Sequence, residues 1–355
     1  MKILVGMSGG IDSSVAAYLL KQQGHEVVGV TMTIWSRRSH LERPLGSTSC
    51  FAPDKSEDIA RIKEICAQIG IEHTVLELSD RFEEVVLTNF KNEYLDGRTP
   101  NPCVWCNERI KFGAMVDYAY ESGIDFDRFA TGHYAQIIDH GGRLSIGRAV
   151  DEKKDQSYFL YRLSQQQLGR TLFPLGSLSK EEVRKIDVKL GFHRPEQSES
   201  QDFYGGDYTD LLEVEESPGN IVNLAGEVLG RHTGIFHYTI GQRKGLGIAS
   251  ARPLYVIALR PEQNEVVVGC AEEREQATVV ASNVVWQACT SLDGEVEVEA
   301  KIRSASRPQR AWAHQDGDQI IARFPDGVHA AALGQSLVFY SEGRILCGGI
   351  ISDAH

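Results

Sequence analysis

Two patterns of apolar residues alternate along the first half of the chain. Continuous apolar runs, typical of buried strands, occur within residues 2–7, 25–35, 72–78 and 126–137. Apolar residues at helical spacing occur within residues 12–24, 56–70 and 179–191, and the last two segments begin with serine and end with glycine. This alternation predicts a parallel, doubly wound α/β sheet.

The pattern changes from about Asn220 onward, where short strand-like runs are separated by glycine-rich turns. After Glu273, apolar and polar residues alternate with period two, for example in 295–305 and 335–351, which predicts a β-barrel or sandwich. A chain of 355 residues is too long for one core of ordinary size, so we expect two or three domains.

Composition and charge limit the classes of protein to consider. Hydrophobic residues make up 42% of the chain, and no apolar run approaches the roughly 20 residues that span a bilayer. The first residues enter a strand-like run without the apolar segment of a signal peptide, so we expect a cytoplasmic protein without a membrane partner. The net charge of −12 excludes a generally basic surface but leaves room for a local basic groove.

A glycine- and serine-rich loop, GMSGGIDSS at residues 6–14, joins the first strand to the first helix. Ser8, Gly9, Gly10 and Ser13 can present N–H groups and hydroxyls to an anion at the carboxyl edge of a parallel sheet. The loop lacks the Gly-Lys-Ser/Thr of a Walker A loop and the dinucleotide fingerprint. A plain glycine turn is the alternative, but the order Ser-Gly-Gly-x-Asp-Ser favours a phosphate-binding loop.

This order resembles the pyrophosphate loop (PP-loop) of the ATP pyrophosphatases, which adenylate a substrate oxygen and release pyrophosphate. Further runs along nearly the whole chain resemble one family within that group, the tRNA-specific 2-thiouridylases, which replace the C2 oxygen of the wobble uridine by sulfur. The runs are TPNPCVWCNERIKF, ATGHYA, KDQSYFLYRL, FHYTIGQRKGLG and LGQSLVFY, and their order and spacing make the match close.

The resemblance implies a fold, an activity and its cofactors. It implies a PP-loop catalytic domain over 1–204, a small central domain over 205–272 and a tRNA-contacting C-terminal β-barrel over 273–355. The implied activity is that of a tRNA-uridine 2-sulfurtransferase. It requires ATP, Mg²⁺, a tRNA with a wobble uridine, and a sulfur donor that is either a persulfide carrier protein or sulfide. Asp12 would lie near Mg²⁺.

The resemblance also assigns binding residues by position. The ATP-binding set is Gly6, Met7, Ser8, Gly9, Gly10, Ile11, Asp12, Ser13, Met32 and Gly132. The tRNA-binding set is Asn101, Pro102, Cys103, His133, Lys154, Asp155, Gln156, Arg303, Ser304 and Gln335. The residues themselves support part of this, because the run KIRSASRPQRAW carries four cations and Trp312, as a surface for phosphates and stacked bases would. A solvated strand face has the same composition.

The seven cysteines include a CxxC pair, Cys103 and Cys106, at the start of a predicted helix. Known members of the family place their nucleophilic cysteine at the position of Cys106 and an acidic residue at that of Cys103. Their second cysteine lies in a run like ESQDICF, where this chain has Tyr204. The usual pair of cysteines on separate segments is therefore absent.

Four hypotheses follow for the CxxC pair. Two ordinary cysteines and a zinc site are the weaker ones, because zinc needs further ligands that the sequence does not supply. A redox pair would use Cys106 as the persulfide carrier and Cys103 as the resolving thiol, with a lowered thiol pKa at the helix start. A 4Fe–4S cluster held by Cys50, Cys103 and Cys106 is slightly favoured. The remaining cysteines, Cys66, Cys270, Cys289 and Cys347, are expected in the core.

Two other functions remain open on the residues alone. One is a different PP-loop enzyme, such as an amidotransferase or an adenylating ligase, which would not need tRNA. The other is a non-catalytic RNA-binding protein with a vestigial loop, which the intact loop order disfavours.

Overall fold

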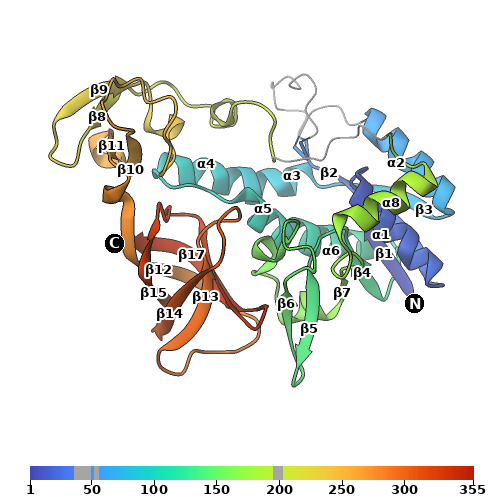
Figure 1. Ribbon diagram of the computed structural model, residues 1–355. Helices are drawn as coiled ribbons and strands as arrows, with labels where there is room; N and C mark the ends of the chain where they lie inside the picture. The colour runs from blue at the N-terminus through green and yellow to red at the C-terminus, as the bar shows by residue number, and fades with distance from the viewer. Residues whose placement is uncertain (36–48, 52–55, 195–202) are drawn as a thin grey trace. The chain divides into compact units, whose positions relative to one another are not determined.

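The computed structural model describes residues 1–35, 49–51, 56–194 and 203–355 (Figure 1). The chain forms two compact units. The first comprises Met1–Val86, Pro102–Tyr208 and Gly343–Ile345, and the second comprises Leu87–Asn101, Thr209–Glu342 and Leu346–His355.

The first unit is built on a parallel sheet of five strands in the order β3-β2-β1-β4-β7. The five strands are β1 (Lys2–Gly6), β2 (Glu26–Thr33), β3 (Glu72–Glu77), β4 (Arg128–Ala130) and β7 (Thr171–Leu172). The first unit also contains an antiparallel hairpin outside this sheet, formed by β5 (Gln136–His140) and β6 (Arg143–Gly147). The helices of the first unit are α1 (Ile11–Gln22), α2 (Ser56–Ile69), α3 (Ser79–Phe82), α5 (Pro102–Trp105), α6 (Met115–Glu121), α7 (Gln165–Gly169) and α8 (Lys180–Leu190). The π-helices η1 (Glu83–Leu87) and η2 (Cys106–Ala114) and the 3-10 turns η3 (Ser157–Leu160) and η4 (Tyr208–Leu211) complete it, with η1 and η4 each running into the second unit.

Helices cover both faces of this sheet because its strands are apolar on both sides (Figure 1). Ile3 and Val5 of β1 pack with α1 and α2, whose apolar stripe includes Ile62 and Ile65. On the opposite face, a side chain at Gly6 would meet Phe129 and Met115, the first residue of α6. The doubly wound parallel sheet predicted from the sequence is confirmed.

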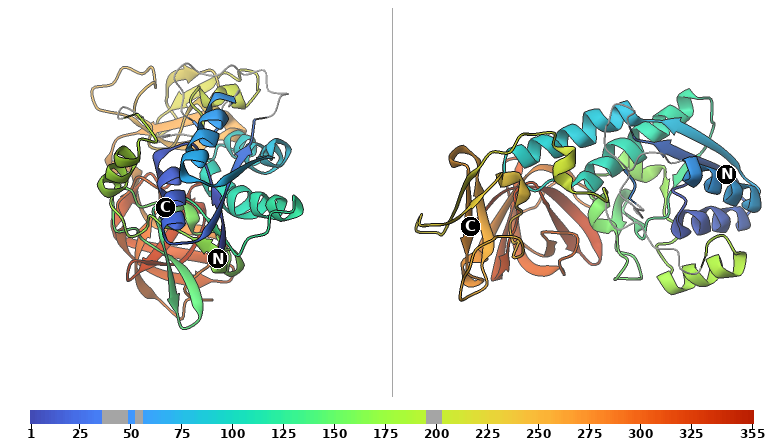
Figure 2. Two further views of the ribbon diagram at one scale, coloured as in Figure 1. Left: turned by 90° about the vertical axis from the view of Figure 1, so that its right-hand side faces the viewer. Right: turned by 90° about the horizontal axis from the view of Figure 1, so that it is seen from above.

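The second unit is rich in β-strands and contains two sheets (Figure 2). The smaller sheet has the order β10-β11-β8-β9, with β8 (Gly219–Val222), β9 (Val228–His232), β10 (Tyr255–Arg260) and β11 (Glu265–Gly269). The larger is an antiparallel barrel in the order β12-β15-β14-β13-β16-β17, closed by pairing of β12 with β17. Its strands are β12 (Glu275–Trp286), β13 (Val296–Lys301), β14 (Gln309–Asp316), β15 (Gln319–His329), β16 (Ser336–Ser341) and β17 (Arg344–Ala354). The unit also contains α4 (Thr88–Leu95) and the 3-10 turns η5 (Ile235–His237), η6 (Pro261–Gln263) and η7 (Glu272–Arg274).

The predicted C-terminal barrel is also confirmed, since alternate residues of its strands point into one core that includes Val298, Ala300, Ala311 and Ala313. The boundaries at residues 204 and 272 stay a prediction. Within the part of the chain that the structure describes, no helix has the length and apolar character to cross a membrane.

Helix α8 shows how local sequence sets an element boundary. Ser179 and Glu182 form a capping box, in which the Ser179 hydroxyl accepts from the Glu182 N–H and the Glu182 carboxylate accepts from the Ser179 N–H. Gly191 ends the helix at φ 67°, a left-handed conformation that favours glycine.

The substitution Ser179→Ala removes the cap and should lower the local stability of α8 by about 1 kcal/mol. Hydrogen–deuterium exchange in the first turn of α8 should then become about fivefold faster. Ser122→Ala, at an exposed serine directly after α6, is the control and should leave exchange in α8 unchanged. Equal exchange in α8 for both variants would contradict the capping role.

Candidate active site

The loop between β1 and α1 has its backbone carbonyls tied back into the protein. The Gly10 carbonyl accepts from the hydroxyls of Ser13 and Ser14 at 3.0 and 3.1 Å. The Met7 carbonyl accepts from the Thr31 hydroxyl at 2.7 Å. Because these oxygens are occupied, the loop can turn its N–H groups toward an anion without carbonyl repulsion.

The helix that follows the loop begins without a side-chain cap. Gly10 is the N-cap residue of α1 and provides no side-chain hydrogen bond to the first turn. The positive end of the helix dipole and its N–H groups are therefore available for a phosphate. Gly9 has φ +80°, and a Cβ there would lie 3.1 Å from Ile62, so glycine is required on both counts.

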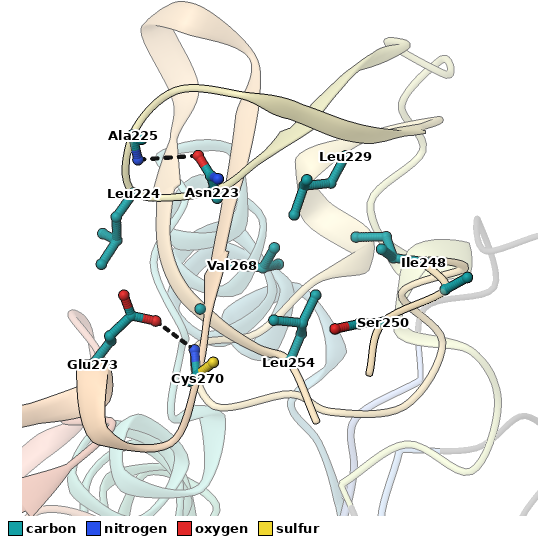
Figure 3. Close-up of a pocket in the computed structure, with 12 residues that line it drawn as sticks. Asn223, Leu224, Ala225, Leu229, Ile248, Ser250, Leu254, Val268, Cys270 and Glu273 are labelled. Atoms are coloured by element: carbon teal, nitrogen blue, oxygen red, sulfur yellow. Dashed lines mark hydrogen bonds between the residues drawn. The ribbon is translucent and has the colours of Figure 1, made fainter. Parts of the chain in front are cut away.

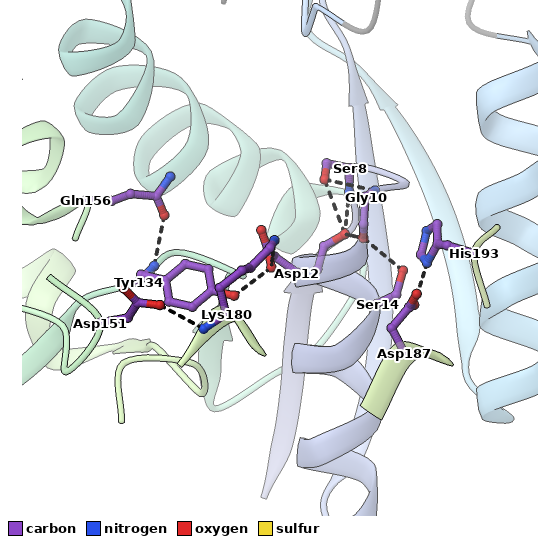
Figure 4. A network of polar contacts seen from close by, with 11 residues as sticks. Ser8, Gly10, Asp12, Ser14, Tyr134, Asp151, Gln156, Lys180, Asp187 and His193 are labelled. Carbon is purple, nitrogen blue, oxygen red and sulfur yellow. Dashed lines mark hydrogen bonds and ion pairs between the residues drawn. The ribbon is translucent and has the colours of Figure 1, made fainter. Parts of the chain in front are cut away.

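Asp12, in the first turn of α1, is held by two side chains (Figure 4). Its Oδ1 atom lies 2.7 Å from the Lys180 ammonium and accepts a hydrogen bond from the Tyr134 hydroxyl at 2.8 Å. Lys180 is only 7% exposed, and its backbone N–H donates to Asp151. Asp12, whose side chain is 32% exposed, thus pairs with a buried lysine, and its predicted role near Mg²⁺ would rest on its second oxygen.

Sequence reasoning missed Lys180, which lies 168 residues from Asp12. One signal could have found it. Lys180 is the first residue of α8, where a cation opposes the helix dipole. Such a placement indicates a counter-charge supplied from elsewhere in the fold.

Met32 and Gly132 lie at the same edge of the sheet as the loop, because Met32 is near the carboxyl end of β2 and Gly132 follows β4. Gly132 packs directly on α1. A Cβ on it would lie 2.7 Å from the Asp12 carbonyl carbon and the Ser13 nitrogen. The structure therefore brings the ATP-binding residues expected from the sequence to one place.

The tRNA-binding residues expected in the first unit have structural partners there. Gln156 exchanges hydrogen bonds with the Tyr134 backbone at 2.9 Å, and Asp155 accepts from the Ala149 and Ser157 N–H groups. The Lys154 N–H donates to the Asp151 carbonyl.

His133 lies next to Gly132, with Nδ1 2.8 Å from the Thr131 hydroxyl and its ring near Phe112 and Phe173. Burial and the nearby Lys111 charge hold the pKa of His133 well below its usual value. Its ring is therefore neutral at neutral pH.

The expected tRNA-binding residues of the second unit are spread over two segments. Gln335 donates to the Thr99 and Pro100 carbonyls, directly before the buried Asn101. Arg303 donates to the His329 and Ala330 carbonyls, and Ser304 beside it is exposed.

Of the four cations in the run KIRSASRPQRAW, Lys301 is buried, while Arg310 pairs with Glu297 and lies 5.5 Å from the ring centroid of Trp312. Arg307 is exposed and Arg303 is half-buried.

Cys106 lies at a junction between two kinds of helix. The short helix α5 begins at Pro102, contains Cys103, and passes at Cys106 into η2, a π-helix. The buried Arg162 contacts both sides of this junction. Its Nε lies 2.6 Å from Glu108, and its guanidinium lies 4.6 Å from the Trp105 ring centroid. π-helical turns are rare and often mark functional sites.

The Cys106 thiol is 6% exposed, and burial raises its pKa to about 12. Lys111 opposes this rise, while the thiols of Cys50 and Cys103 add to it. The lowered pKa expected for this cysteine at a helix start was wrong, because the loss of hydration outweighs the helix dipole.

Cys50 lies beside the position where known members of the family carry their second cysteine. Its thiol is 3.6 Å from the Phe203 carbonyl oxygen, and the next residue, Phe51, pairs with Tyr204 in a parallel bridge. Its influence on Cys106 puts Cys50 in the same neighbourhood as the CxxC pair. Even so, among the described residues no three or more His, Cys, Asp or Glu side chains are grouped to hold a metal ion.

The other cysteines follow the core expectation only in part. Cys66 and Cys347 are buried, and burial raises the pKa of Cys66 to about 11. Cys270 and Cys289 are only partly buried. Cys270 lines a cavity of about 450 Å³ together with Leu229 and Leu254, and its N–H donates to Glu273 (Figure 3). The expectation was wrong for Cys270 because β11 ends just before it.

Alkylation of the folded protein by iodoacetamide should be slower at Cys106 than at the half-buried Cys103. The rate at Cys106 should rise about tenfold per pH unit between about pH 7 and about pH 9, because the thiolate fraction rises in proportion below the pKa. Mass spectrometry of the labelled peptides measures both rates. In denaturant the two cysteines should react alike, and equal rates in the folded protein would contradict the burial of Cys106.

Three family models match the chain in succession. They are the tRNA methyl transferase HUP domain over residues 1–204, the tRNA methyl transferase PRC-barrel domain over 211–270 and the aminomethyltransferase beta-barrel domain over 276–351.

Among its relatives, the tRNA-specific 2-thiouridylase MnmA of Endomicrobium trichonymphae is 44% identical over 99% of both chains. The enzyme named tRNA-specific 2-thiouridylase MnmA 1 of Clostridium botulinum is 43% identical over 99% of both chains. That of Clostridium perfringens is 41% identical over 99% of this chain and 98% of its own. Because these matches run along the whole chain, the protein belongs to the family of the tRNA-specific 2-thiouridylases.

Proposed function

We propose that this enzyme uses ATP to replace the C2 oxygen of the wobble uridine of tRNA by sulfur, in the cytoplasm. The observation that carries the proposal is the loop from Met7 to Gly10, with its carbonyls tied back and an uncapped helix behind it, in a chain that matches tRNA-specific 2-thiouridylases from end to end. Residues 1–204 would carry the chemistry, 205–272 would form the central domain, and 273–355 would contact tRNA.

ATP would bind with its phosphates on the loop and its adenosine near Met32 and Gly132. The uracil C2 oxygen attacks the α-phosphorus, and pyrophosphate leaves. A carbonyl oxygen is a poor leaving group, whereas AMP is a good one, so adenylation makes C2 open to displacement. Mg²⁺ would neutralise charge on the phosphates, and the Asp12 oxygen that does not face Lys180 is the nearest carboxylate in the loop helix.

Sulfur would reach C2 from Cys106. A persulfide carrier transfers its terminal sulfur to Cys106, that sulfur attacks C2, and AMP leaves with the original oxygen. Cys103 then attacks the Cys106 sulfur, so that the thiolated base is released and a Cys103–Cys106 disulfide forms. This oxidation of two thiols balances the release, and an external thiol reductant restores the pair.

A 4Fe–4S cluster on Cys50, Cys103 and Cys106 is the other hypothesis for sulfur delivery. Its support is the common neighbourhood of the three thiols. In the structure, these three side chains are not arranged as the ligands of one metal site. Iron and sulfide analysis of anaerobically purified protein separates the two hypotheses, because only the cluster predicts iron in stoichiometric amount.

The substitution Gly132→Ala should raise the KM for ATP about tenfold or more, because the new methyl group displaces the first turn of α1. Gly169→Ala is the matched control, since its Cβ would meet only Leu144, at 3.8 Å, and neither glycine is left-handed. Initial rates of pyrophosphate release at varied ATP measure the effect. An unchanged KM for ATP in Gly132→Ala would contradict the proposal that the segment after β4 is part of the ATP site.

Cys106→Ser should abolish thiolation of the wobble uridine while tRNA-dependent release of pyrophosphate persists, because adenylation precedes sulfur transfer. Cys270→Ser is the control and should retain both activities. Mass spectrometry of tRNA nucleosides, with a persulfide or sulfide donor, gives the product. Full activity of Cys106→Ser would refute sulfur delivery from this residue.

The same assay tests the alternative functions. A different PP-loop enzyme would release pyrophosphate without tRNA, and a non-catalytic RNA-binding protein would release none. Ser13→Ala with undiminished thiolation would separate the loop from the chemistry and so refute the proposal.

A further inference from the structure

Two buried ionisable side chains lie behind the phosphate-binding loop and have no part in the chemistry described above. Asp187 is in the last turn of α8, and His193 follows the helix end at Gly191. Their side chains are 3% and 0% exposed, and Asp187 Oδ1 lies 2.6 Å from His193 Nδ1 (Figure 4).

The second ring nitrogen of His193 contacts the loop itself. Nε2 lies 3.1 Å from the Gly9 carbonyl oxygen. A carbonyl oxygen can only accept, so Nε2 must carry a proton. Asp187 and Nδ1 share a further proton. Whichever of these two groups holds that proton, Nε2 remains a donor.

This contact fixes the direction of one peptide group. In a planar trans peptide, the Gly9 carbonyl and the Gly10 N–H point in opposite directions. Anchoring the carbonyl on His193 turns the Gly10 N–H to the other side, where it donates to the Ser8 hydroxyl over a long nitrogen–oxygen distance of 3.4 Å. A peptide between two glycines has little orientational preference of its own, so an external anchor decides it.

We propose that Asp187 and His193 are positioning residues that hold the Gly9–Gly10 peptide with its N–H toward the phosphates of ATP. The inference rests on the proposed binding of ATP to this loop. Asp187 acts through His193 by holding the ring at Nδ1 so that Nε2 faces the loop, and His193 acts through the Gly9 carbonyl. Neither touches the substrate.

The test compares two double variants that differ only in the donor. Asp187→Asn with His193→Gln keeps an amide N–H for Gly9, and Asp187→Asn with His193→Met has none, while the asparagine avoids an unpaired buried carboxylate. Loss of the donor should raise the KM for ATP about tenfold, and the glutamine variant should stay within about threefold of the wild type. The KM for tRNA should not change in either. Val188→Met, at an exposed neighbouring position of α8, is the control for the introduced methionine.

A methionine double variant with the thermal midpoint and the KM for ATP of the wild type would overturn the positioning role. If Ser13→Ala raises the KM for ATP in the same assay, only the positioning role has failed. If Ser13→Ala has no effect either, the loop does not bind ATP, and the proposed function has failed.

A second measurement needs no variant. Nitrogen-15 NMR of the histidine rings in the wild-type protein should show a slowly exchanging proton on Nε2 of His193. A ring protonated on Nδ1 alone would refute the anchor even if the methionine variant does not fold.

Discussion

The packing of Gly132 against the first turn of α1 is the constraint on which the candidate site depends. No side chain fits there, so the end of β4 reaches the backbone of Asp12 and Ser13. Two residues later, Tyr134 reaches the Asp12 carboxylate, which in turn pairs with the buried Lys180. Burial of the Lys180 ammonium costs hydration energy, and its pairing with the partly exposed Asp12 carboxylate offsets that cost only in part. The pair therefore contributes position more than stability, because it ties the starts of α1 and α8 together at the edge of the sheet.

At Cys106, burial lowers the chemical reactivity of the side chain. A thiol whose pKa is raised to about 12 is protonated at neutral pH, and a protonated thiol is a poor nucleophile. In this state the residue reacts slowly with adventitious electrophiles. Hydration of the segment or the arrival of a sulfur donor would increase its reactivity. Within the described part of the chain, the charge of Lys111 favours the thiolate in this environment, and Lys111 lies five residues along the same π-helix.

The sequence predicted the elements whose signals are local. Strands β1 to β4, helices α1, α2 and α8, and the loop between β1 and α1 depend on periodicity and on residues a few positions apart. Elements such as α3, α7 and β7 are too short to show such periodicity and were not predicted. The sequence did not predict Lys180, because its partner Asp12 is far away in the chain, or the pKa of Cys106, because burial is a property of the folded molecule. The π-helix at Cys106 has no established sequence signal. In the run from Glu199 to Gly206, Tyr204 stands at the position of the family's second cysteine. Part of this run lies outside the described residues.

The loop from Met7 to Gly10 shows why side chains from several elements surround two adjacent glycines. Glycine permits the left-handed turn at Gly9, but the same freedom leaves each peptide without a preferred direction. The fold supplies that direction from three separate elements. Thr31 of β2 holds the Met7 carbonyl, His193 after α8 holds the Gly9 carbonyl, and Ser13 of α1 holds the Gly10 carbonyl. Since a peptide whose oxygen is tied back presents its N–H on the other side, this arrangement sets the charge that the loop offers to an anion before the anion arrives.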